Sequence, residues 1–299
     1  MTALIMDGKV AAARLKAMIA IKALEFRDRH KIPATLAVVL VGTDGASQVY
    51  VRAKTRACEE VGITSIQHTL GETTTEEELL DVVARLNLDS AIHGILVQLP
   101  LPRHIDPNRI LGSINPTKDV DGFHEVNVGR LARGEKNGFV PCTPLGCMLL
   151  LSETREQIAG LDALVIGRSN IVGRPMAQLL LQKGATVTIA HSQTRDLAER
   201  VGRADILVAA VGVPELVKGH WIKPGAIVLD VGITRLDTGG RRIVGDVEFE
   251  SAKRIAGAIT PVPGGVGPMT VACLLDNTIS AAFRAQCRET HGTVQHAQL

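Results

Sequence analysis

The amino-acid sequence predicts an α/β fold divided into two domains. With 299 residues, the chain is long enough to build two hydrophobic cores. Short runs of Val, Ile, Leu and Ala alternate with longer stretches of helical periodicity, an order typical of parallel sheets covered by helices. Hydrophobic residues make up 45% of the chain and aromatic residues only 2%, so aliphatic side chains must fill these cores.

The first half of the chain contains three predicted strands separated by helices. A helix over residues 7–29 precedes the first strand, and Asp44 is the expected N-cap of a second helix that Gly62 ends. A third helix is expected over 75–87, because acidic residues fill the first turn of that segment. The strands are expected at residues 36–41, 65–70 and 94–97. This alternation predicts a parallel or mostly parallel sheet.

A glycine turn just past the middle of the chain belongs to the second domain. An apolar run over 163–166 stops at Gly167, and the turn that follows leads into an amphipathic helix. A strand, a tight turn and a helix in this order begin a dinucleotide-binding fold, where free backbone N–H groups at the helix start can hold a pyrophosphate. The pattern also fits an ordinary turn, because Ser169 stands where the second glycine of G-x-G-x-x-G would be.

Other predicted elements of the second domain flank this turn. A helix over 144–151 is expected to bridge the two domains. Further strands are expected at residues 186–190, 206–209, 226–230 and 258–259, with a hairpin that turns at 237–240.

The residues after the strand at 186–190 indicate which dinucleotide this domain prefers. An NAD site carries Asp or Glu at this strand end for the ribose 2′-hydroxyl, whereas the chain has no acid over 191–195. Ser192 and Arg195, with Arg168 from the glycine turn, would instead bind a 2′-phosphate. The pattern therefore favours NADP over NAD.

Two chemically capable side chains lie one helical turn apart in the first domain. Tyr50 and Lys54 are neighbours at (i, i+4) spacing on the second predicted helix. Helical periodicity groups one apolar face, with Lys54 at its edge: Ala46, Val49, Tyr50, Ala53, Ala57 and Val61. Lys54 is then either a lysine that extends from the rim of a buried face, or a partly desolvated amine suited to proton transfer.

Three more segments carry candidate site residues. Gln98 ends the strand at 94–97, at the edge where open α/β sheets place ligand sites. Asp119 and Asp121 lie in a polar loop, where they could be turn and cap residues or present a carboxylate to a ligand. The Pro- and Gly-rich segment 263–267 is either a helix-entry turn or a stiff loop against which a planar ligand can lie.

Composition argues against several other classes of function. The formal net charge is +2 and the basic residues are dispersed, so neither nucleic acid nor a membrane surface is an expected partner. No apolar run approaches the length of a membrane span, and no signal-peptide core is apparent, so we expect a cytoplasmic protein. Five cysteines without a C-x-x-C pair fit a reducing compartment, and nine histidines without ligand spacing predict no metal site.

Together these segments resemble the bifunctional methylenetetrahydrofolate dehydrogenase/cyclohydrolase family. The resemblance extends to about residue 285 and includes the segment from Lys118 to Gly122. Four motifs carry it, in this order: Tyr50-Val51-Arg52-x-Lys54, Gly94 to Pro102, Gly167-Arg168-Ser169-x-Ile171-Val172-Gly173-x-Pro175, and Pro263 to Thr270.

The resemblance implies an enzyme of one-carbon metabolism. It would oxidise 5,10-methylenetetrahydrofolate with NADP⁺ to 5,10-methenyltetrahydrofolate and hydrolyse that product to 10-formyltetrahydrofolate, a donor for purine biosynthesis. A homodimer is implied, with the folate in a cleft between the two domains of each subunit. We assign residues 1–125, joined by the helix 269–286, to the folate-binding domain, 140–268 to a Rossmann-like NADP-binding domain, and 287–299 to a disordered tail.

The resemblance also implies a role for each site residue. Lys54 would be the central catalytic group, Gln98 its hydrogen-bond partner, and Asp121 the group that holds the polar edge of the pterin. Tyr50 would pack against the folate rings, with other substrate contacts from Val97, Leu99, Pro263, Gly264 and Gly265. The NADP site would be lined by Gly167, Arg168, Ser169, Ser192 and Ile233.

Two other functions fit part of the same pattern. One is an NADP-dependent dehydrogenase without hydrolase activity, because both activities would share one site. The other is a non-catalytic nucleotide sensor, which would not need Lys54, Gln98 and Asp121 to converge. Hydrolysis of methenyltetrahydrofolate without NADP⁺ separates the first from the bifunctional enzyme, and any folate turnover excludes the second.

Overall fold

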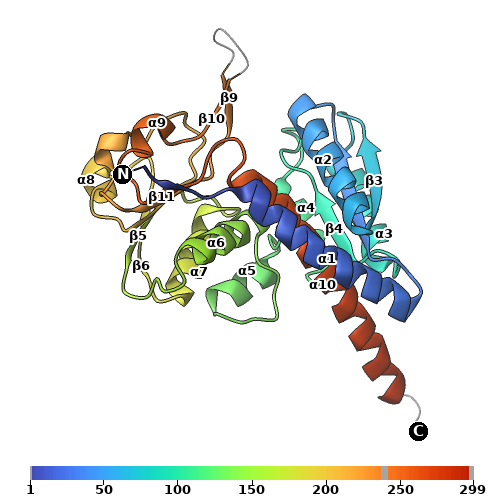
Figure 1. Cartoon of the computed structure of the whole chain (residues 1–299). Helices are drawn as coiled ribbons and strands as arrows, with labels where there is room; N and C mark the ends of the chain where they lie inside the picture. Colours follow the sequence, from blue (N-terminus) through green and yellow to red (C-terminus); the bar gives the residue numbers. More distant parts are fainter. Residues whose placement is uncertain (1, 237–241, 296–299) are drawn as a thin grey trace. The chain divides into compact units, whose positions relative to one another are not determined.

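The computed structural model describes residues 2–236 and 242–295 as two compact units (Figure 1). Unit 1 comprises residues 1–13, 131–134 and 141–270, and unit 2 comprises residues 14–130, 135–140 and 271–299. Two long helices, α1 (Gly8–His30) and α10 (Val266–Gln295), contribute residues to both units.

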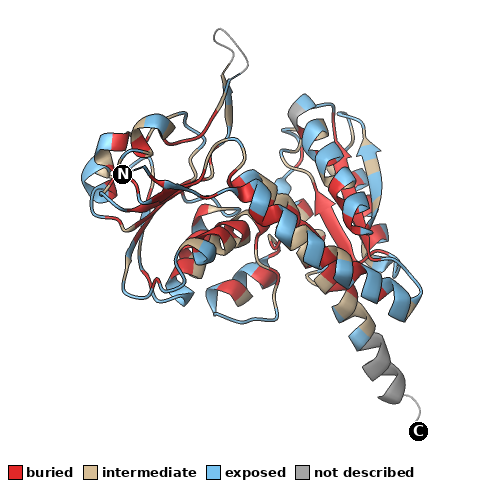
Figure 2. Ribbon diagram, viewed as in Figure 1, coloured by how far each residue is buried: buried red, intermediate tan, exposed pale blue. Residues whose placement is uncertain are grey.

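Unit 2 is built on a three-stranded parallel sheet in the order β3-β2-β4. The central strand β2 (Thr35–Val41) is buried along its whole length, as a strand covered on both faces should be. Figure 2 shows the buried residues of each unit in red. Its neighbours are β3 (Thr64–Leu70) and β4 (Gly94–Val97), and the core includes Val39, Ile95 and Leu79. The carboxyl end of β4 is thereby fixed beside that of β2, with Val39 opposite Val97.

The helices of unit 2 have clear local start signals. Asp44 accepts a hydrogen bond from the Ser47 N–H at the start of α2 (Gly45–Val61), and Gly62 ends that helix in the left-handed conformation. A capping box between Thr75 and Glu78 begins α3 (Glu76–Leu88). Two short helices that were not predicted follow: α4 (Pro107–Ser113) and α5 (Glu125–Ala132).

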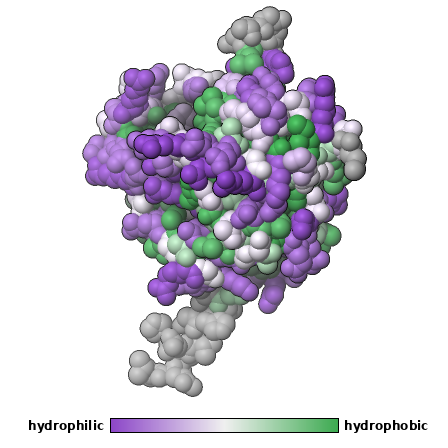
Figure 3. All heavy atoms as spheres, turned by 90° about the vertical axis from the view of Figure 1, so that its left-hand side faces the viewer, coloured by the Kyte–Doolittle hydropathy of each residue, from purple (hydrophilic) through white to green (hydrophobic). Residues whose placement is uncertain are grey.

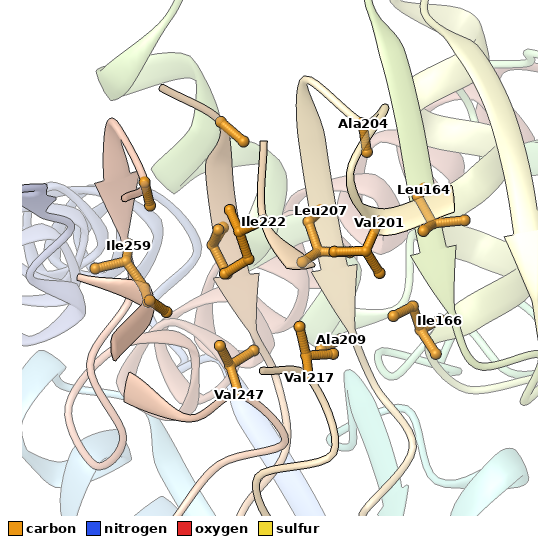
Figure 4. Packing of buried hydrophobic residues seen from close by; sticks show 14 of the residues in the cluster. Leu164, Ile166, Val201, Ala204, Leu207, Ala209, Val217, Ile222, Val247 and Ile259 are labelled. Carbon is orange, nitrogen blue, oxygen red and sulfur yellow. The ribbon is translucent and has the colours of Figure 1, made fainter. Parts of the chain in front are cut away.

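Unit 1 contains a six-stranded, entirely parallel sheet in the order β1-β11-β8-β7-β5-β6. Its inner strands bury aliphatic side chains from neighbouring positions, among them Leu164, Leu207 and Ile259 (Figure 4). The strands are β1 (Leu4–Ile5), β5 (Asp162–Ile166), β6 (Thr186–Ala190), β7 (Ile206–Ala209), β8 (Ile227–Asp230) and β11 (Ala258–Ile259). The two-residue strand β1 was not predicted, because only its long-range pairing with β11 makes it a strand.

Unit 1 also contains a two-stranded hairpin and several helices. The predicted hairpin is formed by β9 (Thr234–Leu236) and β10 (Arg242–Val244), and its expected turn at 237–240 lies outside the described residues. The helix expected to bridge the domains, α6, belongs to unit 1. The helices are α6 (Cys142–Thr154), α7 (Gly173–Gln182), α8 (Leu197–Val201), η1 (Gly219–Trp221) and α9 (Phe249–Ala252).

The first and last described segments of the chain group with different units. Residues 1–13 group with unit 1 through the β1–β11 pairing, and α10 continues to Gln295. The segment Val266–Cys287 is long and apolar enough to cross a membrane by composition, contrary to expectation, but 61% of its most apolar window is buried inside the fold, as in a core helix. Polar and apolar residues intermingle over the face shown in Figure 3.

Candidate functional site

A hydrogen bond joins the second helix of unit 2 to the end of its third strand. Lys54 Nζ, on α2, donates to Gln98 Oε1 at 2.9 Å, and both side chains are half-buried. The backbone of Gln98 is held by a 2.8 Å hydrogen bond from its N–H to Val39 O, so β2 positions it. The side-chain amide in turn donates through Nε2 to Leu99 O, which leaves Oε1 facing the lysine. The partnership that the resemblance implied for these two residues is present.

The apolar face predicted for α2 is confirmed at Ala57 and Val61, which are buried, but is wrong in its first half. Val49 is 55% exposed and Tyr50 is 42% exposed, whereas Val51 and Cys58 are buried on a different side of the helix. The buried positions Ser47, Val51 and Cys58 recur at helical spacing, so this side of the helix faces the core and turns Val49 and Tyr50 outward. Tyr50 therefore offers its ring to solvent or to a ligand, on the same helix as Lys54.

Cys58 lies one turn beyond Lys54 but is not a candidate nucleophile. Burial raises the pKa of its thiol to about 12, and the charge of Glu59 adds to this effect. A thiol with so high a pKa is almost entirely protonated at neutral pH, and the thiolate is the reactive form. Cys58 is therefore a core residue.

The two candidate aspartates have different environments. Asp119 is buried, with 1% of its surface exposed, and accepts hydrogen bonds from the Phe123 N–H, the His124 N–H and Asn127 Nδ2. It thus holds the start of α5, which is a structural role. Asp121 is half-buried. An isolated parallel bridge pairs Asp119 with Ile95 of β4, so this loop lies beside the strand that Gln98 follows. Of the two, Asp121 remains the candidate for ligand binding.

In unit 1 the glycine turn is as tight as its sequence predicts. Gly167 has a φ of +123°, and a Cβ on it would lie 2.2 Å from Ala210 O. A Cβ on Gly173 would lie 2.1 Å from Gly167 O, so both positions require glycine. Arg168 and Ser169 are exposed at the tip of the turn, where they can contact a ligand.

The expectation that the N–H groups at the start of α7 are free is wrong. Ser169 Oγ accepts from the N–H groups of Val172 and Gly173, at 3.2 and 3.3 Å, and Ser169 O accepts from the Arg174 N–H at 3.1 Å. The next residue, Pro175, has no N–H. This serine replaces the second glycine of the usual motif by closing the turn with its own hydroxyl. A pyrophosphate would thus depend on other donors, such as the Ser169 hydroxyl proton and the Arg168 guanidinium.

The predicted 2′-phosphate residues lie at one edge of the unit 1 sheet. Strands β5 and β6 are adjacent and parallel, and the Gly167 N–H donates to Ala190 O at 2.9 Å. Arg168 and Ser192, which follow the two strand ends, are therefore on the same carboxyl edge, and both are exposed. Ile233, beyond β8, is 52% exposed.

Two buried carboxylates support the loops beside this edge and were missed by the sequence analysis. Asp246 Oδ2 accepts from the N–H groups of Val211 and Gly212, which follow β7. Asp230 accepts from the N–H groups of Gly232, Asp246 and Val247. Burial raises the pKa of Asp230 to about 7, and the charge of Asp246 adds to that rise. The available signal was the glycine near each aspartate in the sequence: a Cβ on Gly232 would collide with the carboxylate of Asp246, and one on Gly245 with that of Asp230.

The other predicted substrate residues divide between the units. Val97 is buried in β4, and Leu99 is half-buried just after it, in unit 2. The loop with Pro263, Gly264 and Gly265 belongs to unit 1, where a Cβ on Gly8 would lie 1.6 Å from Gly265 O. Among the described residues, no group of three His, Cys, Asp or Glu side chains could hold a metal ion.

Comparisons with known proteins cover nearly the whole chain. The model of the tetrahydrofolate dehydrogenase/cyclohydrolase catalytic domain matches residues 6–121, and that of its NAD(P)-binding domain matches residues 141–286. The bifunctional protein FolD 1 of Roseobacter denitrificans is 59% identical over 95% of this chain and 96% of its own. Bifunctional protein FolD 3 of Rhizorhabdus wittichii is 60% identical over 94% and 93%.

Solved structures agree with these matches. The bifunctional enzyme FolD from Campylobacter jejuni is 50% identical, with a TM-score of 0.91 over 94% of this chain and 98% of that one. The FolD of Trypanosoma brucei, complexed with NADP cofactor and an inhibitor, is 42% identical, with a TM-score of 0.91 over 95% and 99%. The chain therefore belongs to the tetrahydrofolate dehydrogenase/cyclohydrolase family.

Proposed function

We propose that the protein oxidises 5,10-methylenetetrahydrofolate with NADP⁺ and hydrolyses the resulting 5,10-methenyltetrahydrofolate to 10-formyltetrahydrofolate. The observation that carries the proposal is the hydrogen bond from Lys54 Nζ to Gln98 Oε1 in the domain that matches the family's catalytic domain. The family, its bifunctional relatives and the NADP-bound homologue support the same pair of reactions.

The two reactions ask different things of the protein. In the first, a hydride leaves the methylene carbon for the nicotinamide, and the protein's main task is to position the reactants. In the second, water adds to the methenyl carbon, loses a proton, and the carbon–nitrogen bond to N5 breaks as that nitrogen gains a proton. A side chain that can accept and donate protons near this carbon would speed the second reaction.

Lys54 is the residue that we assign to this proton transfer. An ammonium group has three donors, and Gln98 accepts one of them, which fixes the direction of the amine. Because Gln98 is neutral, it orients the lysine without pairing its charge. Tyr50 is exposed one turn away on α2 and can pack against a flat ring, and Asp121 offers a carboxylate to the pterin's amino and ring N–H donors.

The donors in unit 1 fit NADP⁺. We assign Gly167 and Ser169 to the dinucleotide backbone, and Arg168 with Ser192 to the 2′-phosphate, because these side chains are exposed at one sheet edge. Ile233 provides an exposed apolar contact beyond β8. When bound, NADP⁺ supplies the hydride acceptor.

An assay with purified protein tests both activities. Methylenetetrahydrofolate with NADP⁺ should yield NADPH, and methenyltetrahydrofolate alone should lose its absorbance faster than in buffer. NADPH formation without faster hydrolysis would reduce the function to that of a dehydrogenase, and the absence of both activities would exclude the proposed function.

We also propose that the protein is a cytoplasmic homodimer that supplies purine biosynthesis. The family resemblance supports the dimer and the pathway, and the cysteine usage supports a reducing compartment. A monomer in light scattering would contradict the dimer.

A further inference from the structure

Unit 2 contains a cavity that none of the proposed reactions uses. Its volume is ≈ 290 Å³, close to the lower limit for sites that hold small ligands. It is lined by the end of α3, by the loop before Asp119, by residues near α5 and by α10, all within unit 2. Lys54, Gln98, Tyr50 and Asp121 are not among the described residues that line it.

Three basic side chains surround this cavity, and none of its described lining residues is acidic: the basic residues are Lys118, Arg130 and Arg284. Asn87, Asn137 and Thr117 add polar groups, and Ile92 with Phe139 provides an apolar wall. Such a wall beside concentrated positive charge suits a ligand that has one anionic group and an apolar body.

Two of the three cations are held in place by the protein. Lys118 Nζ donates to Leu86 O at 3.0 Å and to Asp89 O at 2.6 Å, which uses two of its three donors. Arg284 Nη1 donates to Asn137 O at 3.1 Å, and its guanidinium lies 4.6 Å from the centre of the Phe139 ring. Held groups lose less entropy when they bind a ligand than mobile surface side chains do.

A buried histidine is also part of the lining. His93 is 2% exposed, and its Nδ1 accepts from the Thr35 N–H at 3.1 Å. In the neutral ring the proton is then on Nε2, a buried atom without a hydrogen-bond partner among the described groups. Burial lowers the pKa of His93, and the charge of Lys118 lowers it further, which keeps the ring neutral. Because Nε2 is itself closed to solvent, His93 adds a neutral side to the cavity and leaves the binding of an anion to the three cations.

We propose that this cavity is a second ligand site, which binds a small organic oxyanion. The phosphate or carboxylate would lie among Lys118, Arg130 and Arg284, and the apolar body against Ile92 and Phe139. The site is independent of the Lys54 chemistry and does not require the proposed function to be correct.

Calorimetric titration of the full chain with defined probes tests this site. The solution contains saturating NADP⁺, so that the phosphate-binding groups of unit 1 are already occupied. Phenyl phosphate and benzoate carry both features of the ligand, inorganic phosphate only the anion, and phenol only the ring. We expect saturable binding of phenyl phosphate or benzoate that is tighter than that of phosphate or phenol, and the tighter of the two identifies the anionic group.

Three variants assign the binding to this cavity. Arg130→Gln and Arg284→Gln should each weaken binding about tenfold or more, the effect of losing one charge-assisted hydrogen bond. Arg29→Gln removes the same charge from an exposed position of α1 outside the cavity and should leave binding unchanged. Arg284 is exposed but also contacts Asn137 and Phe139, so denaturant unfolding of its variant must match that of the wild type for the binding result to count. The proposal is overturned if no probe binds saturably, or if all three variants bind as the wild type does.

Discussion

Lys54 Nζ lies 2.9 Å from Gln98 Oε1, although the two residues are separated by 44 positions in the chain. The contact depends on α2, which packs against β2 and β3, and on β2, which pairs with β4 and positions the backbone of Gln98. An amine oriented by a neutral amide at the end of a buried strand is the feature on which the proposed hydrolysis rests.

The neutrality of Gln98 should matter for the hydrolase activity. In Gln98→Glu, a carboxylate beside Lys54 would favour the charged amine, because an opposite charge within hydrogen-bond distance stabilises it. We expect the hydrolase kcat at neutral pH to fall about tenfold or more and its pH profile to move to higher pH. Gln67→Glu, on exposed β3, is the matched control. An unchanged pH profile in Gln98→Glu would argue against proton transfer by the lysine.

Asp121 and Asp119 should respond differently to the same substitution. Asp121→Ala should weaken folate binding about tenfold or more and leave NADP⁺ binding unchanged, because the carboxylate is assigned to the pterin. Asp119→Ala should instead lower the free energy of unfolding by about 3 kcal/mol, since three donors in buried or half-buried hydrogen bonds lose their acceptor. Titrations of both ligands and denaturant unfolding measure these effects. Equal loss of both ligands in Asp121→Ala would contradict its assignment.

The 2′-phosphate assignment predicts a selective effect on the cofactor. Arg168→Ala or Ser192→Ala should raise the KM for NADP⁺ roughly tenfold without changing the KM for methylenetetrahydrofolate, because each removes one phosphate contact. Arg254→Ala, at another exposed position of unit 1, serves as the control. The assignment fails if the wild type uses NAD⁺ as well as NADP⁺.

The buried carboxylate pair predicts a dependence of stability on pH. The folded-state pKa of Asp230 is raised from 3.8 to about 7, first by burial and then by Asp246. Its contribution to the free energy of unfolding is therefore fully present below pH 3.8 and is lost as the pH rises through about 7. Asp246→Asn removes the neighbouring charge while its amide oxygen can still accept from Val211 and Gly212.

We expect the decrease in the free energy of unfolding between pH 5 and pH 8 to be smaller in Asp246→Asn than in the wild type. Denaturant unfolding across this range measures the difference. Burial, the larger cause, is unchanged, so part of the pH dependence should persist. Parallel pH curves for the two proteins would show that the carboxylates do not interact.

The sequence predicts best those features that arise from local chemistry. The turn at Gly167 follows from steric demands within a few residues, and the strand at 94–97 from its apolar run before two prolines. Long-range features were harder to predict: β1 exists only through its pairing with β11. The exposed position of Tyr50 depends on which side of α2 the sheet occupies, and periodicity alone could not distinguish the two apolar sides.

The most direct test of the central claim is the rate of methenyltetrahydrofolate hydrolysis by Lys54→Met. The substitution keeps the length and apolar stem of the side chain but removes the amine, so folding and the Kd for NADP⁺ should be unchanged. We predict a hydrolase kcat lower by a factor of at least about 10². Hydrolysis at the wild-type rate by this folded variant would contradict the role of Lys54.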